Sequence, residues 1–579
     1  MPDSNLNGSF NQQSNPFSQG GADTVSGVER VHKKKGKKVA IISGVTVAAI
    51  AGGGIAAYNL SPFVKNQVKL RTMKADAYYA WVGDENLQEF AKEASESYGE
   101  VLKSYEDGVK GSAALTYTAS EEVKDMLRGE IDDDDEEADV ARDIIDNFEK
   151  FTLGVDYSSR QGASQFSFFT KLNDDDLVSL DCVVDVMNYD LFFRVPQLTE
   201  QYVNISGKDY IEDLDSDLAE FREIYEDIIQ NPSDYLSASD LEREIIRYGS
   251  VWFDTVGDVS LEKSEEVDVL DITAKYTVAT VELDEAHLLK LAESFLSELK
   301  GDDIIKNIVV DKLEVMDEDE YESAIDEYIN EISDSEASDE VLVVVKTYID
   351  PKGKIRGLSI TDKDSDNGFK AILGKHSDKI RGELKVFEDG EDIFYSKLEA
   401  DEEKKETYTG SLEFTAYDDE EDYTVSIDFD EIKETNEKKH YIDGDITINI
   451  PEIDPINIYF DSDGSSQDIS YDILIHEKDY GRITLSYSSD DDGNITIPDK
   501  SDAFIVDPEN IENIDFRDYI TEKDAEKFCK DILVKIGLSS DDAEKYAAEA
   551  VEELYDEIDD AADRIEDRIE DNDYKYYEF

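Results

Sequence analysis

Apolar residues follow three different patterns along the chain, and each pattern predicts a different kind of structure. The segment from Val39 to Leu60 is an almost unbroken run of small and apolar residues. From Phe151 onward, apolar residues cluster or alternate with a period of two, which is typical of strands. Between and after these segments they recur every three or four residues, which is typical of helices with one apolar face.

The run at residues 39–60 predicts one transmembrane helix. Its 22 residues span ~33 Å, which is enough for a hydrocarbon core of ~30 Å. Basic residues before the run place the N-terminus in the cytoplasm, although further basic residues follow it. A cleaved signal peptide is the main alternative, but the polar leader and the apolar run are both long for one. The basic residues before the run are Arg30, Lys33, Lys34, Lys35, Lys37 and Lys38.

The expected membrane helix also carries a stripe of small residues. Such a stripe allows two helices to approach closely, so a homodimer through this helix is one interpretation. The other is that small residues are simply common in membrane helices. The stripe consists of Ala40, Gly44, Ala48, Gly52 and Ala56.

The pattern divides the chain into five parts. Residues 1–38 have little periodicity and are expected to be a disordered cytoplasmic tail, which residues 39–60 connect to the part outside the membrane. We expect residues 61–150 to form a helical stem and short helices near 119–128 and 136–149. Residues 151–505 are expected to form an antiparallel sheet with interleaved helices, and residues 506–579 a C-terminal helical cap. No proline- or glycine-rich linker separates these outer parts, so one domain and two domains both fit the sequence.

The stem contains three aromatic residues at its start. Tyr78, Tyr79 and Trp81 suit either the bilayer surface or the inside of the outer domain. Further helices are expected near 208–229, 238–250 and 288–299. In the last of these, the positions Leu288, Leu289, Ala292, Phe295, Leu296 and Leu299 form one apolar face that we expect to be buried.

The stretch from Val341 to Ile497 predicts about ten strands in sequence. Asp350-Pro-Lys-Gly353 separates two apolar runs, with Pro and Gly at the turn positions that favour them. Short loops between the runs imply a long antiparallel meander, and a sheet this wide twists and curls. The other hairpins are Gly410–Tyr417 with Tyr423–Phe429, Tyr441–Ile450 with Ile456–Phe460, and Ile469–Ile475 with Gly481–Tyr487.

Two helices close the chain. Thr521 and Asp524 form a capping pattern at the start of the first, and Gly537 ends it. The second begins after Ser540. We expect these helices to cover the apolar face of the curled sheet. The fold class is therefore α+β, a large curved antiparallel β-meander covered by helices and preceded by one transmembrane helix.

The charge narrows the range of partners. The chain has a net charge of −84, and because residues 1–64 carry six basic and three acidic residues, the other 515 residues carry −87. Nucleic acids and anionic headgroups would be repelled from such a surface. The 32 Tyr and 24 Phe residues nevertheless provide ample material for a folded core.

Cysteine and histidine suggest no metal or redox site. Cys182 and Cys529 are the only cysteines, and each lies in an apolar pattern as a small buried residue would, although a bridge between them is an alternative. The five histidines have no ligand spacing. These are His32, His287, His376, His440 and His476.

Motifs for catalysis or calcium binding are also missing. The chain has no G-x-S-x-G, H-E-x-x-H or P-loop motif, and carboxylate pairs suited to glycoside hydrolysis arise by chance among 142 acidic residues. Asp362, Asp364 and Asp366 alternate as in a calcium loop, but Leu373 stands where the bidentate Glu belongs. Asp461–Gly464 and Asp490–Gly493 fit hairpin turns better than metal loops. We therefore single out no catalytic, cofactor-binding or metal-ligating residue and expect no cofactor.

Three segments resemble a known group of proteins. They are the alternation Leu177–Pro196, the anchor Lys37-Lys-Val-Ala-Ile-Ile and the exit Asn59-Leu-Ser-Pro-Phe-Val64, and they look like membrane-anchored extracytoplasmic proteins of Gram-positive gut clostridia. The outer domain distantly resembles curved-sheet carriers of lipoproteins and lipids. This second resemblance implies a concave sheet whose apolar inner face holds an acyl chain, and it transfers no functional residue. A filled core is the alternative for that face.

Two functions follow as expectations. The first is a non-catalytic, single-pass membrane protein whose extracytoplasmic domain binds an apolar ligand or an envelope protein. The second is a structural or sensing component of the cell envelope that acts through protein contacts. A glycoside hydrolase-like enzyme is a third and weaker reading.

Overall fold

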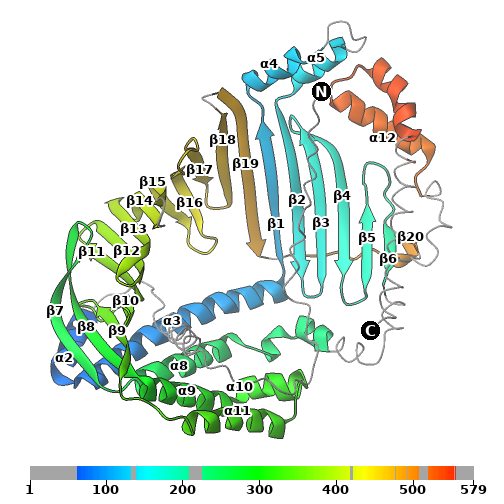
Figure 1. The fold of residues 1–579 in the computed structure, drawn as a ribbon. Coiled ribbons are helices and arrows are strands. Elements are labelled where there is room, and N and C mark those ends of the chain that lie inside the picture. Colours follow the sequence, from blue (N-terminus) through cyan, green and yellow to red (C-terminus); the bar gives the residue numbers. More distant parts are fainter. Residues whose placement is uncertain are drawn as a thin grey trace, which may run out of the picture. The chain divides into compact units, whose positions relative to one another are not determined.

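The protein is an α+β structure built around one sheet of twenty strands (Figure 1). The computed structural model describes residues 62–131, 138–207, 224–417, 422–475, 478–491, 493–506, 519–552 and 555. The expected tail at 1–38 and the expected transmembrane helix at 39–60 lie outside these residues. Among the described residues, no helix combines the length and the apolar composition that a membrane crossing requires.

The sheet is open and curved, and its strands follow one another in a single row. The order across the sheet is β7 to β19 in sequence, then β1 to β6, and finally β20. All neighbours are antiparallel except β6 and β20, which are parallel. The predicted meander is therefore confirmed and is longer than expected.

The first ten strands in order of sequence comprise β1–β6, which lie beyond β19 in the sheet, and β7–β10, which begin the meander. Their bounds are β1 (Val109–Thr118), β2 (Lys150–Arg160), β3 (Ala163–Leu172), β4 (Asp175–Asp185), β5 (Asp190–Arg194), β6 (Val203–Ser206), β7 (Val259–Val269), β8 (Ile272–Asp284), β9 (Val341–Ile349) and β10 (Ile355–Asp362). Those of the other ten are β11 (Gly368–His376), β12 (Lys379–Glu388), β13 (Glu391–Lys404), β14 (Thr407–Ala416), β15 (Tyr423–Asn436), β16 (Tyr441–Asn449), β17 (Ile456–Ser462), β18 (Ser466–Ile475), β19 (Lys478–Asp491) and β20 (Phe504–Val506).

Strand β1 joins two parts of the sheet that are far apart in sequence. Leu115 in β1 lies opposite Leu485 of β19 on one side and opposite Leu153 of β2 on the other. The prediction of a helical stem at this point of the chain is wrong for Val109–Thr118. The segment has small and polar residues with little apolar alternation, so its strand state depends on the two partners that it pairs with.

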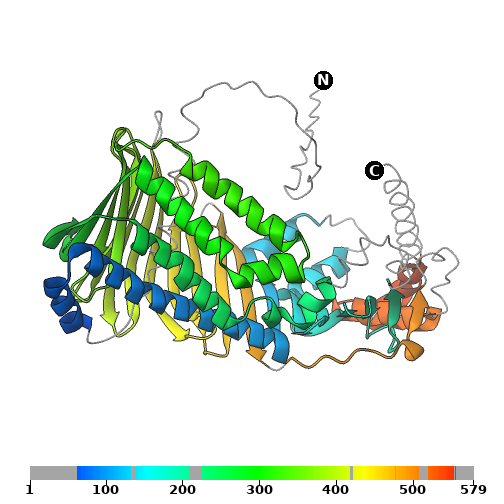
Figure 2. The same ribbon diagram turned by 90° about the horizontal axis from the view of Figure 1, so that it is seen from below.

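The helices lie mainly beside the β7–β10 end of the sheet. Figure 2 shows α3, α8, α9 and α11 as a layer on one side of the strands. The helices before β9 are α2 (Pro62–Thr72), α3 (Ala75–Asp107), α4 (Glu121–Gly129), α5 (Ala138–Asn147), α8 (Ala238–Thr255), α9 (Glu285–Lys300), α10 (Asp303–Lys306) and α11 (Glu318–Ser333). Helix α11 is not predicted by the sequence pattern, and residues 208–223 of the helix expected at 208–229 lie outside the described residues.

The main core lies where α3 and α8 meet β8 and β9. Tyr79 in α3 is 1 % exposed, and its hydroxyl is 3.0 Å from the Thr347 hydroxyl of β9 and accepts a hydrogen bond from the Trp252 indole of α8. Val281 of β8 and Val345 of β9 are fully buried beneath these helices. Tyr78 and Tyr79 therefore pack into the domain, which decides between the two expectations for them.

A second core forms where the β7–β8 hairpin folds over its neighbours. Val269, Ile272 and Tyr276 pack with Ile372 of β11 in one buried cluster. The Tyr276 hydroxyl donates to the Leu373 carbonyl at 2.9 Å. The β7–β8 hairpin thus packs against β11, and this contact buries side chains from both.

The C-terminal helices form a small core of their own. Thr521 caps α12 (Glu522–Lys535) through the Asp524 amide, as the sequence predicts, and Gly537 follows with a φ of +114°. Residues 540–552 form the next helix, and Ala525, Cys529 and Val551 are buried between the two. Helix α12 touches the sheet at β4. Its apolar face is filled by this local cluster, so the prediction that the C-terminal helices cover the apolar face of the sheet is wrong for the described residues. Over β8 and β9 that face is covered by α3 and α8.

Candidate binding site on the apolar face of the sheet

One apolar face runs through the sheet from β9 to β4. Residues opposite each other in antiparallel strands lie on the same face, and so do residues two apart within one strand. The register can therefore be followed from strand to strand. It aligns Val345, Ile360, Phe369, Val386 and Phe394, then Leu398, Leu412, Ile427, Ile448 and Ile456, then Phe460, Ile469, Leu485, Leu115 and Leu153, and then Phe168 with Leu180.

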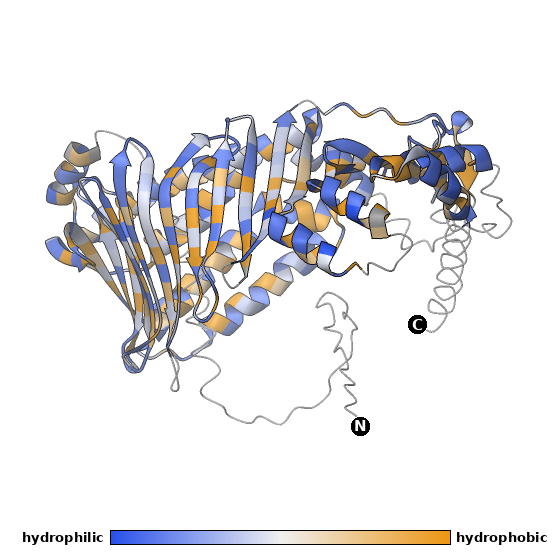
Figure 3. Ribbon diagram, turned by 90° about the horizontal axis from the view of Figure 1, so that it is seen from above, coloured by the Kyte–Doolittle hydropathy of each residue, from blue (hydrophilic) through white to orange (hydrophobic). Residues whose placement is uncertain are grey.

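The helices cover only one end of this face. Val345 and Ile360 are 0 % and 4 % exposed. From β12 to β4 the large aliphatic and phenylalanine side chains aligned above are half-buried or exposed. Figure 3 shows hydrophobic bands, in orange, that repeat from strand to strand across the sheet. Leu115, Leu153, Phe168, Leu180 and Leu485 have exposed fractions of 39–48 %.

An open apolar face and a filled core differ in the exposure of their side chains. A filled core would leave its apolar side chains almost without exposure. That description fits β8 to β10 and does not fit β12 to β4. The described residues therefore leave most of the face open.

The layer of helices shows the same incomplete burial. The prediction that the apolar face of α9 is buried is wrong except at Leu288, because the other five positions are half-buried or exposed. Phe295 is 44 % exposed and lies 5.0 Å from the Tyr248 ring of α8, measured between ring centroids. Val101 in the C-terminal half of α3 is 64 % exposed. Helix and sheet therefore both keep apolar side chains that no described residue covers.

Helix α3 shows how strongly the sheet bends. The Asn86 amide donates to the Gly353 carbonyl at 2.9 Å, and its oxygen accepts from the Ile355 amide at the start of β10. Helix α3 then continues for about 22 residues, or ~33 Å, to the start of β1. Along the sheet, β10 and β1 are ten strand spacings apart, which is ~48 Å. Because the distance along α3 is shorter than the distance across the row of strands, the row of strands is curved.

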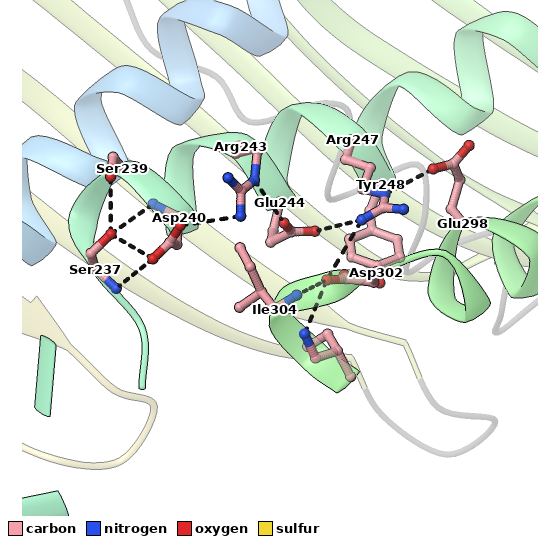
Figure 4. Close-up of polar contacts among 11 residues, drawn as sticks. Ser237, Ser239, Asp240, Arg243, Glu244, Arg247, Tyr248, Glu298, Asp302 and Ile304 are labelled. Carbon is pink, nitrogen blue, oxygen red and sulfur yellow. Dashed lines mark hydrogen bonds and ion pairs between the residues drawn. The ribbon is translucent and has the colours of Figure 1, made fainter. Parts of the chain in front are cut away.

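A buried polar network lies between α8 and α10 (Figure 4). The Tyr248 hydroxyl donates to Asp302 at 2.5 Å, and Asp302 also accepts from the amides of Ile304 and Ile305. Arg247 donates to Glu298 at 2.8 Å and lies 3.8 Å from Glu244. Asp302 is fully buried and Glu244 is 8 % exposed.

The two carboxyl groups of this network have opposite pKa shifts. Burial raises the pKa of Glu244, and the neighbouring Asp302 raises it further by hydrogen bonding and by its charge. Burial alone would also raise the pKa of Asp302, but hydrogen bonds from Tyr248, from the Ile304 and Ile305 amides and from Glu244 lower it. Because Asp302 has no exposed surface, a substrate has no route to it. The network thus ties α8 to the start of α10.

The histidines noted in the sequence have local roles or lie at the surface. The His287 ring lies 2.8 Å from the Asp284 carboxylate that caps α9. His440 is exposed and pairs with Glu434 at 3.1 Å. His376 is exposed at the end of β11, while His32 and His476 lie outside the described residues. Among the described residues, no group of His, Cys, Asp and Glu has a geometry that suits a metal ion.

The acidic repeats fall in or near turns. Asp362 accepts from the Asp364 amide in the β10–β11 connection, and Asp463 accepts from the amides of Ser465 and Ser466 in the β17–β18 turn. The Ser465 hydroxyl also donates to Asp463 at 2.6 Å, and this hydrogen bond, followed by those of the two amides, lowers the pKa of Asp463 to about 2. The hairpin turn expected at 490–493 is wrong, because Asp490 and Asp491 end β19 and pair with β1.

The two cysteines are separate thiols. Cys529 is buried, as the sequence predicts. Cys182 is only half-buried, because its strand presents it on the open apolar face opposite Phe166. The alternation around Cys182 correctly identified the apolar face but not its exposure.

Comparison of the chain with protein-family models, with curated proteins and with solved structures found no match.

Proposed function

We propose that this protein is a non-catalytic binding protein of the bacterial cell envelope, and that its curved sheet holds the acyl chain of a lipid along the open apolar face. The observation that carries the proposal is the continuous face from β12 to β4, in which five large apolar side chains are 39–48 % exposed. Contiguous apolar surface of this extent is rare on proteins without a partner.

The geometry favours a long, flexible occupant. The aligned residues lie side by side across successive strands, so a chain of methylene groups that crosses the strands meets an apolar side chain at each spacing of ~4.8 Å. Each buried CH₂ group contributes about 0.8 kcal/mol, which gives ~12 kcal/mol as an upper limit for a chain of about 16 carbons. Much of this gain is offset by the loss of freedom on binding.

The charge of the chain restricts the headgroup. Residues 65–579 carry −87, and this field disfavours phosphate or carboxylate headgroups without a counter-charge. We therefore expect neutral, zwitterionic or cationic lipids. The anchor expected at residues 39–60 would hold the domain beside a source of such lipids, with the N-terminus in the cytoplasm.

Mass spectrometry of the full-length protein tests the proposal. The protein is purified in a detergent that contains no lipid, and its native mass is compared before and after organic extraction. We expect a removable mass of lipid size and binding of a fluorescent neutral monoacylglycerol. Absence of both would contradict the proposal.

Paired variants locate the site. Leu115→Asn with Leu153→Asn removes two large side chains from the middle of the open face, and we expect at least a ~100-fold weaker probe affinity. Val315→Asn is the control, because Val315 is 63 % exposed and lies outside the strands. Equal weakening by both variants would show that the sheet face is not the site.

A further inference from the structure

A polar pocket lies beside β1, in the interior of the row of strands and apart from the apolar face. It has a volume of about 830 Å³, and its lining comes from β1, β2, β3, β18, β19 and the segments that follow β15, β17 and β19. This volume is within the range of small-molecule binding sites, which is about 300–1,000 Å³.

Most of the lining side chains point away from the apolar face. Lys110 lies opposite Asp490 and Ser158 in the register, one position away from the apolar row of β1. Gln165 lies opposite Ser158, and the alternation of β3 places it on the same side. The pocket therefore opens on the reverse side of the sheet and is distinct from the proposed lipid site.

The pocket is electrically balanced within a strongly acidic protein. Its charged groups are Lys110 and Lys439 against Asp156 and Asp490, while the whole chain carries −84. The remaining lining residues are six serines, Gln165, Asn494, Tyr157 and Gly111. Hydroxyl, amide and carboxylate groups act as donors and acceptors side by side.

Some of these groups are fixed and others are available. Ser167 donates to Asp181 at 2.7 Å, and the Lys439 ammonium group donates to the Ser489 carbonyl. Within the described part of the chain, the side chains of Lys110, Asp156 and Gln165 have no hydrogen-bond or ion-pair partner. A rigid wall with free polar groups is suited to a ligand that offers many hydroxyl groups.

We propose that this pocket binds a short uncharged oligosaccharide. A neutral sugar supplies matched donors and acceptors to the serine, amide and carboxylate groups and suffers no repulsion from the acidic surface. An anionic sugar would have to overcome the negative field around the pocket. A basic peptide would leave the serines and amides mostly unmatched and would be repelled by Lys110 and Lys439.

Isothermal titration of the full-length protein in detergent tests this site. The probes are neutral trimers of glucose and of N-acetylglucosamine, and a sialylated trisaccharide serves as the anionic comparison. We expect at least one neutral trimer to bind with a Kd below ~1 mM, and the sialylated probe to bind at least ten-fold more weakly. The proposal is overturned if neither neutral trimer binds, or if the sialylated probe binds more tightly.

Variants connect the binding to the pocket. We expect Asp156→Ala and Gln165→Ala each to weaken binding of the neutral trimer about ten-fold, since each loses a hydrogen bond to the ligand. The matched control is Asp175→Ala, an exposed position on β4 outside the pocket, which should leave the affinity unchanged. The Leu115→Asn, Leu153→Asn double variant should also retain sugar binding, so a failed lipid site and a failed sugar site give different results. Equal losses in the pocket and control variants would contradict the assignment.

Discussion

The ring of Phe253 in α8 occupies the place where a side chain on Gly83 of α3 would begin. A Cβ atom built on Gly83 would lie 2.3 Å from the Phe253 Cδ1 atom. Gly249 of α8 repeats the arrangement from the other side, since a Cβ there would lie 2.5 Å from a methyl group of Leu87. Two glycines on facing helices thus allow α3 and α8 to pack closely above β8 and β9.

Substitution of Gly83 by alanine should therefore destabilise the domain. Alanine favours helices by about 1 kcal/mol over glycine, but the overlap with Phe253 costs about 1–3 kcal/mol or more. We expect a net loss of about 1–2 kcal/mol in the free energy of unfolding, measured by urea denaturation. Gly129→Ala is the matched control, because nothing lies within 4 Å of a Cβ at Gly129 in α4. A stability change of the same size in both variants would argue against the close packing.

Asn86 should matter for stability out of proportion to its size. Its side chain bonds to Gly353 inside the β9–β10 turn and to Ile355 at the start of β10. Asn86→Ala leaves the two backbone groups without this partner, so we expect a loss of about 1–3 kcal/mol in urea denaturation. Gln88 lies two residues further along α3 and is exposed. Gln88→Ala should therefore change stability by less than about 0.5 kcal/mol. A smaller loss at Asn86 than at Gln88 would refute the tie between α3 and the turn.

Glu244 should make stability depend on pH. Because its pKa is raised in the folded protein above the usual 4.5, folding is favoured while the group is protonated, and that advantage is lost as the pH rises through the raised value. Glu244→Gln keeps the neutral form at all pH values. We expect its unfolding free energy, relative to the original protein, to increase as the pH rises above 4.5. A constant difference between pH 4 and pH 8 would contradict the shift.

Asp302 should respond in the opposite direction. Its lowered pKa means that the ionised form stabilises the fold above the usual 3.8, and this contribution is lost as the pH falls below that value. Asp302→Asn should therefore lower stability at pH 7 by about 1–3 kcal/mol, with a smaller difference near pH 3. The same urea titrations measure both variants. A change in unfolding free energy of the same sign for Glu244→Gln and Asp302→Asn would contradict the opposite pKa shifts.

The two thiols should differ in reactivity. Burial raises the pKa of both Cys182 and Cys529, so access decides between them. We expect a neutral maleimide at pH 8 to label Cys182 at least about ten-fold faster, because it lies on the open face. Cys182→Ser should remove the fast phase in mass spectrometry, and Cys529→Ser should keep it. Equally slow labelling of Cys182 and Cys529 would indicate that the apolar face is covered. If the monoacylglycerol probe slows the labelling of Cys182, the probe binds near β4.

Regular apolar spacing was enough to predict most of the sheet. Hairpins such as Tyr441–Ile450 with Ile456–Phe460 combine β-branched alternation with a short polar turn, and β16 and β17 lie there. The spacing does not predict β1, because β1 is a strand only through its pairing with β19 and β2. Leu485 of β19 lies hundreds of residues from Leu115 in sequence, and Leu153 of β2 lies tens of residues away. Nor does the spacing predict α11, whose many acidic residues obscure the pattern of Tyr321 and Ile325.

The candidate sites depend on information that the spacing does not contain. Alternation at Leu180 and Cys182 identifies an apolar face, but only the positions of the helices determine that it stays open. The polar pocket brings Lys110, Gln165 and Lys439 together through strand registers across more than 300 residues. Glu244 and Asp302 likewise meet through the packing of α8 against the turn after α9. None of these residues belongs to a motif that its neighbours in sequence would reveal.

The position of β1 between β2 and β19 has a consequence for biogenesis. Val109–Thr118 emerges early from the ribosome, but its partner Lys478–Asp491 follows more than 350 residues later. Until then, one edge of β1 has unpaired amides and carbonyls, which readily pair with other chains. Contacts this distant in sequence form slowly. The nascent protein thus has a long period of vulnerability to aggregation that ends only when its last long strand is made, and chaperones that bind exposed strand edges would act in that interval.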